Sequence, residues 1–401
     1  MLFFNAYIYR NRTDGFSYGS FTVENGRFTE VTFYPEDENT SARLSGADTS
    51  GDSVGNPGSG SRTGTDLGGV YVIPGLIDVH THGNMGADFS DADYDGLVRM
   101  GKYLLSQGIT SFAPASMTLP PETLAAVFGT AKRMHEEKPE SAARLIGINM
   151  EGPFFSEKRK GAQNAAYLLN PDFDLLQRLN EASGGLIRIA CVAPELPGAI
   201  PYIQKASKLC TVSVAHTDAG YGEASQAFEA GATQVTHLFN AMPGFHHRNP
   251  GVIGAASERE NVRAELICDG IHVHESAVRA AFKLFPGRIC LISDAGRALG
   301  MPDGRYELGG QETFLSGKRL TLKDGTIAAS VTNLFDCMKN AVEFGIPKEE
   351  AIHSATLVPA RATGCDKELG SIKAGKLADF IVCDESLERK QVYREGSLCG
   401  S

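Results

Sequence analysis

Eight short apolar segments recur along the middle of the chain, and stretches with helical periodicity lie between them. The segments are residues 72–80, 108–116, 144–152, 186–195, 211–219, 233–241, 263–271 and 288–296. Strands that alternate with helices are typical of βα units, whose strands run parallel in one sheet. Eight such units predict an α/β fold of the (β/α)8 TIM-barrel type. An open doubly wound sheet is the alternative, and the count of eight disfavours it.

The two ends of the chain differ from this middle part. Residues 1–35 have the pattern of short strands, and the last thirty residues are rich in turns and then strand-like. We expect residues 1–71 and 371–401 to form a small discontinuous β-sandwich domain beside a barrel of residues 72–370. Residues 36–66 are rich in Ser, Gly and Asp and nearly free of apolar side chains. Such a composition predicts a mobile surface loop.

Charge and composition exclude several classes of function. The formal net charge of −10 argues against nucleic acid or an anionic membrane as the main partner. No apolar run is long enough to cross a bilayer, and the N-terminus lacks the features of a signal peptide. Eight scattered cysteines without a C-x-x-C pair indicate reduced thiols. A cytoplasmic protein is therefore expected.

Histidines and acidic residues gather where the predicted strands end. In IDVHTHGN, His80 and His82 are two residues apart, so on a strand both would point to the same side. The complete set is His80, His82, Glu151, His216, His237 and Asp294. For any one of them alone, a buried hydrogen-bonded side chain is the simpler interpretation. Together, at the barrel face where TIM-barrel active sites lie, they predict a metal site suited to zinc or iron.

The predicted site suggests a reaction class. A divalent metal lowers the pKa of bound water and makes a nucleophile available near neutral pH. A nearby carboxylate can accept the proton and pass it to a leaving group. Asp294, at the end of the last predicted strand, is the candidate for this role. Hydrolysis of an amide, ester or related bond is expected.

Several motifs carry a family resemblance. The D-x-H-x-H motif at residues 78–82, the histidines of the fifth and sixth strands and the aspartate of the eighth resemble the amidohydrolase superfamily. The segments GINMEGPFFSEKRKGAQN, AHTDAGYGEA, THLFNAMPGFHHRNPGVIG, CDGIHVH and SATLVPARATG resemble the N-acetylglucosamine-6-phosphate deacetylase family within it, in that family's order. The fourth strand, IRIACVAPE, has no lysine, which argues against dihydroorotase-like or hydantoinase-like activity.

The resemblance assigns roles to the strand-end residues. It implies that Glu151, His216 and His237 bind the main metal, and that Asp294 is the general base and acid. His80 and His82 occupy positions that vary in the family, and members with H-x-H can hold a second ion. We expect one or two divalent metal ions per chain, zinc or iron, with a binuclear site favoured and a mononuclear site as the alternative.

The resemblance also implies a receptor for phosphate. The turn after the sixth strand would offer backbone N–H groups near Asn240 and Ala241. His247 and Arg248 follow on the same loop, and the family's arginine reaches across a dimer interface. Backbone donors combined with arginine suit a phosphate. A solvated loop without a binding role is the alternative for His247 and Arg248.

Two further residues are expected at the substrate. His272 resembles a residue that contacts the sugar or the reacting amide. Gln163 stands where some members carry a histidine that polarises the acetyl carbonyl. A glutamine amide can donate a hydrogen bond but cannot carry a proton, so a binuclear site would suit this chain better than a mononuclear one.

The implied activity is hydrolytic deacetylation of N-acetylglucosamine 6-phosphate to glucosamine 6-phosphate and acetate. It would serve amino-sugar catabolism or cell-wall recycling, in a homodimer. One alternative is another N-acetylhexosamine phosphate, such as the galactosamine isomer, because a single hydroxyl contact decides between epimers. The other is a catalytically silent barrel that acts as a binding protein. The complete set of candidate ligands disfavours that reading.

Overall fold

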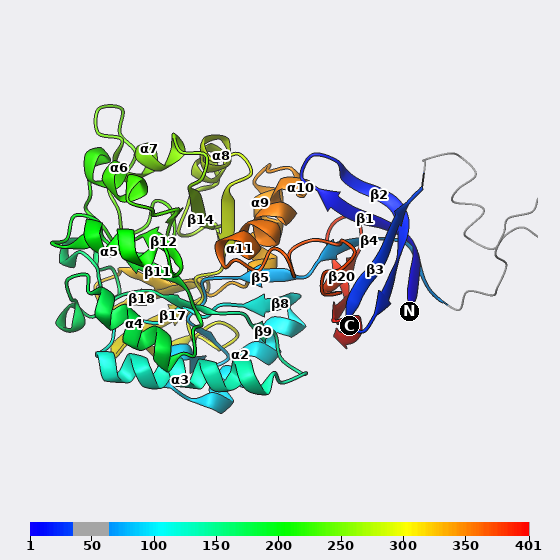
Figure 1. Ribbon diagram of the computed structural model, residues 1–401, viewed down its shortest axis with the longest axis horizontal. Helices are drawn as coiled ribbons and strands as arrows, with labels where there is room; N and C mark the ends of the chain where they lie inside the picture. Colours follow the sequence, from blue (N-terminus) through cyan, green and yellow to red (C-terminus); the bar gives the residue numbers. More distant parts are fainter. Residues whose placement is uncertain (35–63, 401) are drawn as a thin grey trace, which may run out of the picture.

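The structure is a computed structural model that describes residues 1–34 and 64–400. Figure 1 shows a large α/β body and, at its side, a sheet built from strands of both chain ends. Of the predicted loop 36–66, residues 36–63 lie outside the described residues. Residues 64–66 belong to strand β4 and not to a loop, which corrects that end of the prediction.

Each of the eight predicted strand segments contains at least one parallel strand. One sheet joins β5 (Leu76–Asp78), β8 (Ile109–Phe112) and β9 (Arg144–Leu145). A second sheet joins β10 (Ile148–Met150), β11 (Ile187–Val192), β12 (Thr211–Val214), β13 (Gln234–Val235), β14 (Arg263–Ile267) and β15 (Ile289–Ile292) in that order. Strands β9 and β10 are two halves of the third predicted strand.

Backbone hydrogen bonds just beyond the strand ends close these two sheets into a barrel. The N–H of Asp294 donates to the carbonyl of His80 at 2.8 Å, and the N–H of His82 donates to the carbonyl of Ala295 at 2.8 Å. On the other side, the N–H of Asn149 donates to the carbonyl of Pro114 at 3.0 Å. The TIM barrel is thereby confirmed. Because β15 and β5 meet at their carboxyl ends, the segments that carry Asp294 and His80 lie side by side.

Helices cover the outside of the barrel (Figure 1). They are α2 (Tyr94–Ser106), α3 (Pro121–Glu137), α4 (Phe173–Ala182), α5 (Ala199–Ala206), α6 (Tyr221–Glu229), α7 (Gly251–Ser257), α8 (Glu275–Leu284), α9 (Leu334–Glu343), α10 (Lys348–Ala355) and α11 (Leu357–Ala362). Helix α2 shows why they form. The carboxylate of Asp93 caps its N-terminus, and Leu97, Met100 and Leu104 form a buried stripe at helical spacing.

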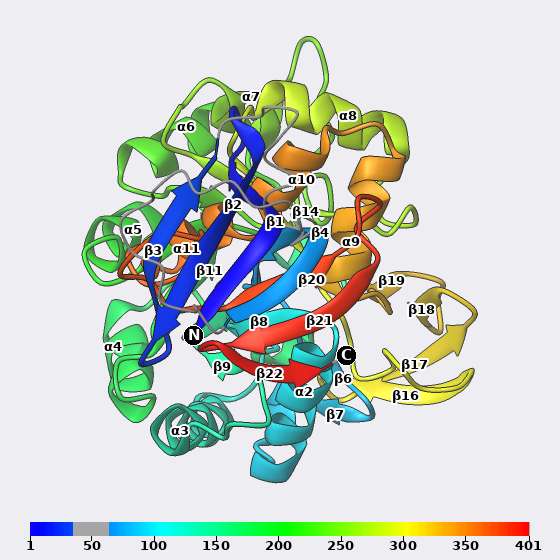
Figure 2. The same cartoon turned by 90° about the vertical axis from the view of Figure 1, so that its right-hand side faces the viewer.

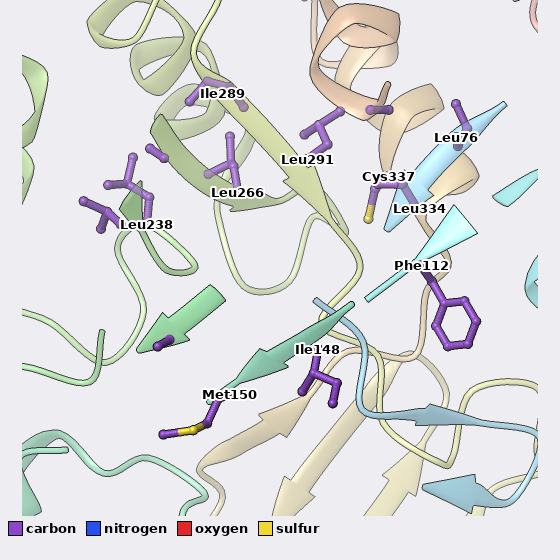
Figure 3. Packing of buried hydrophobic residues seen from close by; sticks show 14 of the residues in the cluster. Leu76, Phe112, Ile148, Met150, Leu238, Leu266, Ile289, Leu291, Leu334 and Cys337 are labelled. Carbon is purple, nitrogen blue, oxygen red and sulfur yellow. The ribbon is translucent and has the colours of Figure 1, made fainter. Parts of the chain in front are cut away.

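The main core lies between the barrel strands and these helices. Figure 3 shows Leu291 of β15 between Leu266 of β14 on one side and Leu334 and Cys337 of α9 on the other. All four side chains are fully buried. Burial of a leucine side chain stabilises a fold by about 1.5–3 kcal/mol, so this layer holds the barrel strands in register and fixes the positions of their ends.

The strands of the chain ends form one sheet with the order β22-β21-β20-β4-β1-β2-β3 (Figure 2). They are β1 (Leu2–Asn11), β2 (Gly15–Glu24), β3 (Arg27–Phe33), β4 (Gly64–Pro74), β20 (Phe380–Cys383), β21 (Arg389–Arg394) and β22 (Ser397–Gly400). Four strand spacings of about 4.8 Å separate β3 from β20 in a flat sheet. Yet the rings of Phe28 and Phe380 are 6.0 Å apart, so the sheet curls around its own aromatic core.

This curled sheet differs from two facing sheets, the sandwich form that we expected for the small domain. Its core encloses Phe3, Phe21, Phe28 and Phe380 within a single hydrogen-bonded sheet. Strand β4 also runs past residue 71 to Pro74. The proposed domain boundaries at 71/72 and 370/371 otherwise stay predictions.

An antiparallel sheet between β15 and α9 has no counterpart in the sequence analysis. It consists of β16 (Gly304–Leu308), β17 (Gln311–Ser316), β18 (Arg319–Leu322) and β19 (Ile327–Ala329). Its inner side chains pack on Met117 and Ala162 at the carboxyl end of the barrel. Smaller elements nearby are β6 (Gly83–Asn84), β7 (Ala87–Asp88) and the 3₁₀ helices η1 (Phe89–Asp91), η2 (Glu157–Arg159) and η3 (Ala165–Tyr167). None of the helices in the described residues is long and apolar enough to cross a membrane.

Candidate active site

A cavity of about 280 Å³ lies at the carboxyl ends of the barrel strands. Nine of the residues predicted from the sequence line it: His82, Glu151, Gln163, His216, His237, Asn240, Ala241, His272 and Asp294. The wall opposite the barrel includes Thr326, Ile327 and Ala328, so the unpredicted antiparallel sheet completes the cavity. His80 is fully buried below it.

Glu151 is the centre of the cluster. Its Oε1 lies 3.2 Å from Nε2 of His216, 3.2 Å from Nε2 of His237 and 3.3 Å from Nε2 of His80. Its Oε2 lies 3.2 Å from Nε2 of His82. Two groups could each hold an ion, namely Glu151 with His216 and His237, and Glu151 with His80 and His82. Glu151 belongs to both groups, so its carboxylate would serve as a ligand in either one.

The outer nitrogens of the imidazoles fix which nitrogen faces the cluster. Nδ1 of His82 lies 3.1 Å from the carbonyl of Ala115, and Nδ1 of His216 lies 2.9 Å from the carbonyl of Arg159. A carbonyl oxygen can only accept, so each Nδ1 carries a proton and Nε2 is the nitrogen that faces the cluster. Metal-binding histidines usually donate the N–H of their other ring nitrogen in this way.

The inward nitrogens themselves fit a cation. Nε2 of His216 and Nε2 of His237 are 3.1 Å apart, and each lies 3.2 Å from Oε1 of Glu151, so three possible ligand atoms face one point. Nε2 of His80 is buried and has no hydrogen-bond partner among residues 1–34 and 64–400. Imidazole nitrogen together with carboxylate oxygen is a suitable donor set for zinc or iron. The residues therefore fit a divalent metal.

The backbone is strained at three of these positions. The φ angles are +43° at His216, +28° at His237 and +49° at Asp294, in the left-handed region that costs a non-glycine residue about 1–3 kcal/mol. Each of the three residues lies two positions beyond the end of a short barrel strand. The left-handed turn directs each side chain over the barrel mouth, and the close packing of the strand ends holds it there.

Asp294 lies opposite Glu151 in the cluster. Its Oδ1 is 3.3 Å from Nε2 of His82 and 3.5 Å from Nε2 of His80. Burial alone would raise the pKa of Asp294, but the facing imidazoles outweigh it and hold the pKa below its usual range. For His82, burial lowers the pKa, but hydrogen bonds with Asp294 and Glu151 outweigh burial and raise the pKa to about 10. Asp294 is therefore ionised at neutral pH, as a general base must be.

Gln163 has a different partner from the one expected. Its Oε1 accepts the backbone N–H of Thr118 at 2.7 Å, and its Nε2 donates to Oε2 of Glu151 at 3.0 Å. Gln163 thus holds the central carboxylate in place while it also lines the cavity. A contact with the acetyl carbonyl, through the second N–H, stays a prediction.

Of the residues predicted for a phosphate receptor, Asn240 and Ala241 line the cavity. The N–H of Asn240 donates to the carbonyl of His237 at 2.9 Å, and the contact of Asn240 with a phosphate stays a prediction. The N–H of Ala241 has no acceptor in the part of the chain that the structure describes. His247 and Arg248 are exposed on the loop between β13 and α7 and do not line the cavity.

Two acidic residues beside the site were missed in the sequence analysis. Asp269 accepts a hydrogen bond from Nδ1 of His272 at 2.6 Å, which turns Nε2 of His272 toward the cavity. Glu265, on β14, contacts Nδ1 of His80 at 2.9 Å. Both lie in the segment RAELICDG, where a glutamate inside an otherwise apolar strand was the available signal.

Comparisons with known proteins agree with this geometry. Residues 71–398 match the Amidohydrolase family. The chain is 36% identical over 346 residues to an N-acetylglucosamine-6-phosphate deacetylase of Bos taurus, covering 83% of this chain and 84% of that protein. It is 35% identical over 337 residues to an N-acetylgalactosamine-6-phosphate deacetylase of Escherichia coli O157:H7, covering 83% and 89%.

Solved structures agree with these sequence comparisons. A variant of the N-acetyl-D-glucosamine-6-phosphate deacetylase of Mycobacterium smegmatis, in complex with N-acetyl-D-glucosamine-6-phosphate, superposes with a TM-score of 0.86 at 29% identity. The alignment covers 100% of this chain and 99% of that one. The deacetylase of Thermotoga maritima superposes with a TM-score of 0.84 at 25% identity, with the same coverage. With its barrel, its strand-end cluster and a family match over most of its length, the chain belongs to the amidohydrolase family.

Proposed function

We propose that this chain is a metal-dependent amide hydrolase that converts N-acetylglucosamine 6-phosphate and water to glucosamine 6-phosphate and acetate. The observation that carries the proposal is the convergence of four imidazoles and Glu151 on one point, with the ionised Asp294 beside them. Two relatives named N-acetylglucosamine-6-phosphate deacetylase are 36% and 37% identical to this chain, over 84% and 81% of their own length. This similarity favours N-acetylglucosamine 6-phosphate among the possible amide substrates.

The metal ligands follow from the two groups of the cluster. Glu151, His216 and His237 would hold the principal divalent ion, and His80 and His82 with Glu151 would hold a second. Zinc and iron both suit these donors. Such an ion polarises the acetyl carbonyl and lowers the pKa of water.

The chain's own residues then move the proton. Asp294 takes a proton from the attacking water and passes it to the nitrogen of the sugar as the C–N bond breaks. Acetate and the free amine are the products, and the carboxylate of Asp294 is regenerated. Gln163 keeps Glu151 oriented throughout, through its hydrogen bond to Oε2.

The phosphate would lie at the outer end of the cavity, where the N–H of Ala241 is a donor. His247 and Arg248 are outside the cavity of their own chain, and they would serve this phosphate if they reached the cavity of a second subunit. We therefore propose a homodimer, located in the cytoplasm. Amino-sugar catabolism or cell-wall recycling would use the product.

The galactosamine isomer is the second candidate substrate. One relative that is 35% identical to this chain is an N-acetylgalactosamine-6-phosphate deacetylase. The two sugars differ in the orientation of one hydroxyl. Metal ligands and Asp294 serve both substrates equally. A silent binding protein is disfavoured because no candidate ligand is missing.

The test is acetate release by purified, metal-loaded protein. N-acetylglucosamine 6-phosphate, its galactosamine isomer and unphosphorylated N-acetylglucosamine are compared, each with and without a chelator, and metal is counted per chain. We expect chelator-sensitive turnover that requires the phosphate and is fastest with the first substrate. Faster turnover of the isomer would reassign the substrate. No acetate from any of the three, in protein that contains metal, would reject the proposed reaction.

A further inference from the structure

Glu265 lies inside the barrel and takes no part in the proposed reaction. Its side chain is fully buried, on β14 below the cavity. Oε1 accepts a hydrogen bond from Nε2 of Gln234 at 2.6 Å, and Oε2 accepts one from the N–H of His237 at 3.3 Å. Its Oε2 also lies 2.9 Å from Nδ1 of His80. A buried carboxyl group without partners would be costly, and here possible donors face both of its oxygens.

Contact with this carboxylate determines the orientation of His80. A carboxylate only accepts hydrogen bonds, so Nδ1 of His80 carries the proton and Nε2 presents its lone pair to the cluster. Nε2 of His80 lies 3.3 Å from Oε1 of Glu151. His82 and His216 are oriented by backbone carbonyls, which side-chain substitution cannot remove. The orientation of His80 depends instead on a side chain that can be changed.

We propose that Glu265 is the positioning residue for the second metal ion, acting through His80. The proposal rests on the two-ion site of the proposed function. A carboxylate on the outer nitrogen of a metal-binding histidine fixes its tautomer and raises its basicity, and loss of such a partner typically weakens metal binding about 10–100-fold. Glu265 therefore governs the ion held by His80, His82 and Glu151. Among Glu151, His216 and His237, its side chain contacts only the backbone N–H of His237 and orients none of their ligand atoms, so the effect should fall mainly on the ion held by His80, His82 and Glu151.

The surroundings of Glu265 provide a conservative variant. Oε1 of Gln234 is buried and has no hydrogen-bond partner in the described residues. In a Glu265→Gln variant the amide of Gln234 can turn over, so that its Oε1 accepts from the new NH₂ group. The other oxygen of the new side chain still accepts from Nδ1 of His80. Glu265→Gln thus preserves shape and hydrogen bonding and removes only the charge, whereas Glu265→Leu removes the acceptor.

The test counts metal and measures its affinity without substrate. Wild type, Glu265→Gln, Glu265→Leu and His80→Ala are loaded with Zn²⁺, and the two dissociation constants are measured by competition with a chromophoric chelator. Cys290→Ala is the matched control, because Cys290 is the register partner of Glu265 on β15 and is equally buried. Circular dichroism and thermal unfolding establish that each variant is folded.

We expect two ions in the wild type and in Cys290→Ala, with unchanged constants. Glu265→Gln should keep both ions, with the weaker one bound about 10–100-fold less tightly. Glu265→Leu should match His80→Ala and retain only the tighter ion. Wild-type affinity for both ions in folded Glu265→Leu would overturn the proposal, and so would a single ion in the wild type.

If Glu265→Leu does not fold, the Glu265→Gln variant alone tests the proposal. An unchanged dissociation constant for its more weakly bound ion would then overturn the proposal. The outcome is separate from that of the proposed reaction. Failure to release acetate in protein with two ions would reject the substrate and leave the role of Glu265 standing.

Discussion

Oδ2 of Asp269 lies 2.6 Å from Nδ1 of His272 at the edge of the cavity, and both side chains are buried. Oδ1 of the same carboxylate accepts the backbone N–H groups of Ile271 and His272, each at 2.8 Å. The carboxylate therefore closes a tight turn after β14 and at the same time orients the imidazole. His272 is placed with Nε2 toward the substrate because Asp269 holds its opposite nitrogen.

This pair should give a pH-dependent coupling. Burial lowers the pKa of His272, but the hydrogen bond that it donates to Asp269 outweighs burial and raises the pKa above the ordinary value. Burial raises the pKa of Asp269, but the bond to His272 makes the net shift downward. The contribution of His272 to stability is complete below its unfolded pKa and is lost as the pH rises through its folded pKa. That of Asp269 is present above its unfolded pKa and is lost in acid.

The coupling free energy should therefore be greatest between about pH 4 and pH 6.5 and decline at higher pH. A double-mutant cycle with Asp269→Asn and His272→Gln, measured by urea unfolding at pH 5.5 and pH 9.5, checks this. We expect a coupling of about 0.5–3 kcal/mol at the lower pH and a clearly smaller one at the higher. Equal coupling at both pH values would mean that the pair is not ionic.

Asp294→Asn should abolish most turnover without loss of metal. The amide keeps the shape of the side chain but cannot accept the proton, so kcat should fall about 10²–10⁴-fold. The metal content should remain that of the wild type, because the two candidate ligand groups do not include Asp294. Steady-state kinetics and metal analysis on the same preparation check both statements. Substantial loss of metal in this variant would make Asp294 a ligand.

Gln163→Ala should lower kcat/KM by about 10–100-fold, because a hydrogen bond to a charged group contributes about 1.5–3 kcal/mol. The lost bond is the one from Nε2 of Gln163 to Oε2 of Glu151. Gln163→Glu is the comparison, since it keeps the size but sets a second negative charge against Glu151. Kinetics of both variants at equal metal content provide the measurement, and unchanged turnover in Gln163→Ala would remove any role for this residue.

The strand-end residues could be predicted because the geometry of a parallel barrel is general. Once the eight segments are recognised, the carboxyl ends must meet, and His80, His216 and Asp294 come together although they are far apart in sequence. Glu265 could not be placed in the same way. It lies in the interior of β14, and its partner His80 is 185 residues away, so no spacing rule connects the two.

The four-stranded sheet at residues 304–329 was missed for a different reason. Its strands contain three to six residues each and many exposed polar side chains, so the burial pattern that marks a strand is weak. The extent of the phosphate receptor stays a prediction, because His247 and Arg248 are exposed and lie outside the cavity of their own chain.

Removal of metal should destabilise the protein, and the effect should grow with pH. A bound metal at about a thousandfold excess over its dissociation constant stabilises a protein by about 4 kcal/mol. In the metal-free chain the pKa of His82 is raised to about 10, so metal must displace a proton from this imidazole. Because that displacement becomes easier as the pH rises, the Tm difference between loaded and chelated protein should be larger at pH 8.5 than at pH 6. An identical difference at both pH values would show that metal displaces no proton.

Arg248 should act on the cavity of a second subunit. It is exposed on the loop after β13 and is absent from the cavity of its own chain. Arg248→Ala should therefore lower kcat/KM for the phosphorylated substrate by about 10–100-fold, the value of a hydrogen bond to a charged group. Slow turnover of the unphosphorylated sugar should not change. Arg259→Ala is the control, since that side chain pairs with Glu229 on the outside of the barrel.

Mixed dimers then test whether Arg248 acts on the cavity of its own chain or on that of the partner subunit. Asp294→Asn and Arg248→Ala are each nearly inactive, but a hybrid of the two contains one cavity with an intact Asp294 that faces the intact Arg248 of the other subunit. Unfolding and refolding the two variants together at equal amounts should restore about a quarter of the wild-type rate, because half of the dimers are hybrids with one competent site each. If the mixture is no more active than the sum of the separate variants, Arg248 does not reach across a subunit interface, and the phosphate must be held by residues of the same chain.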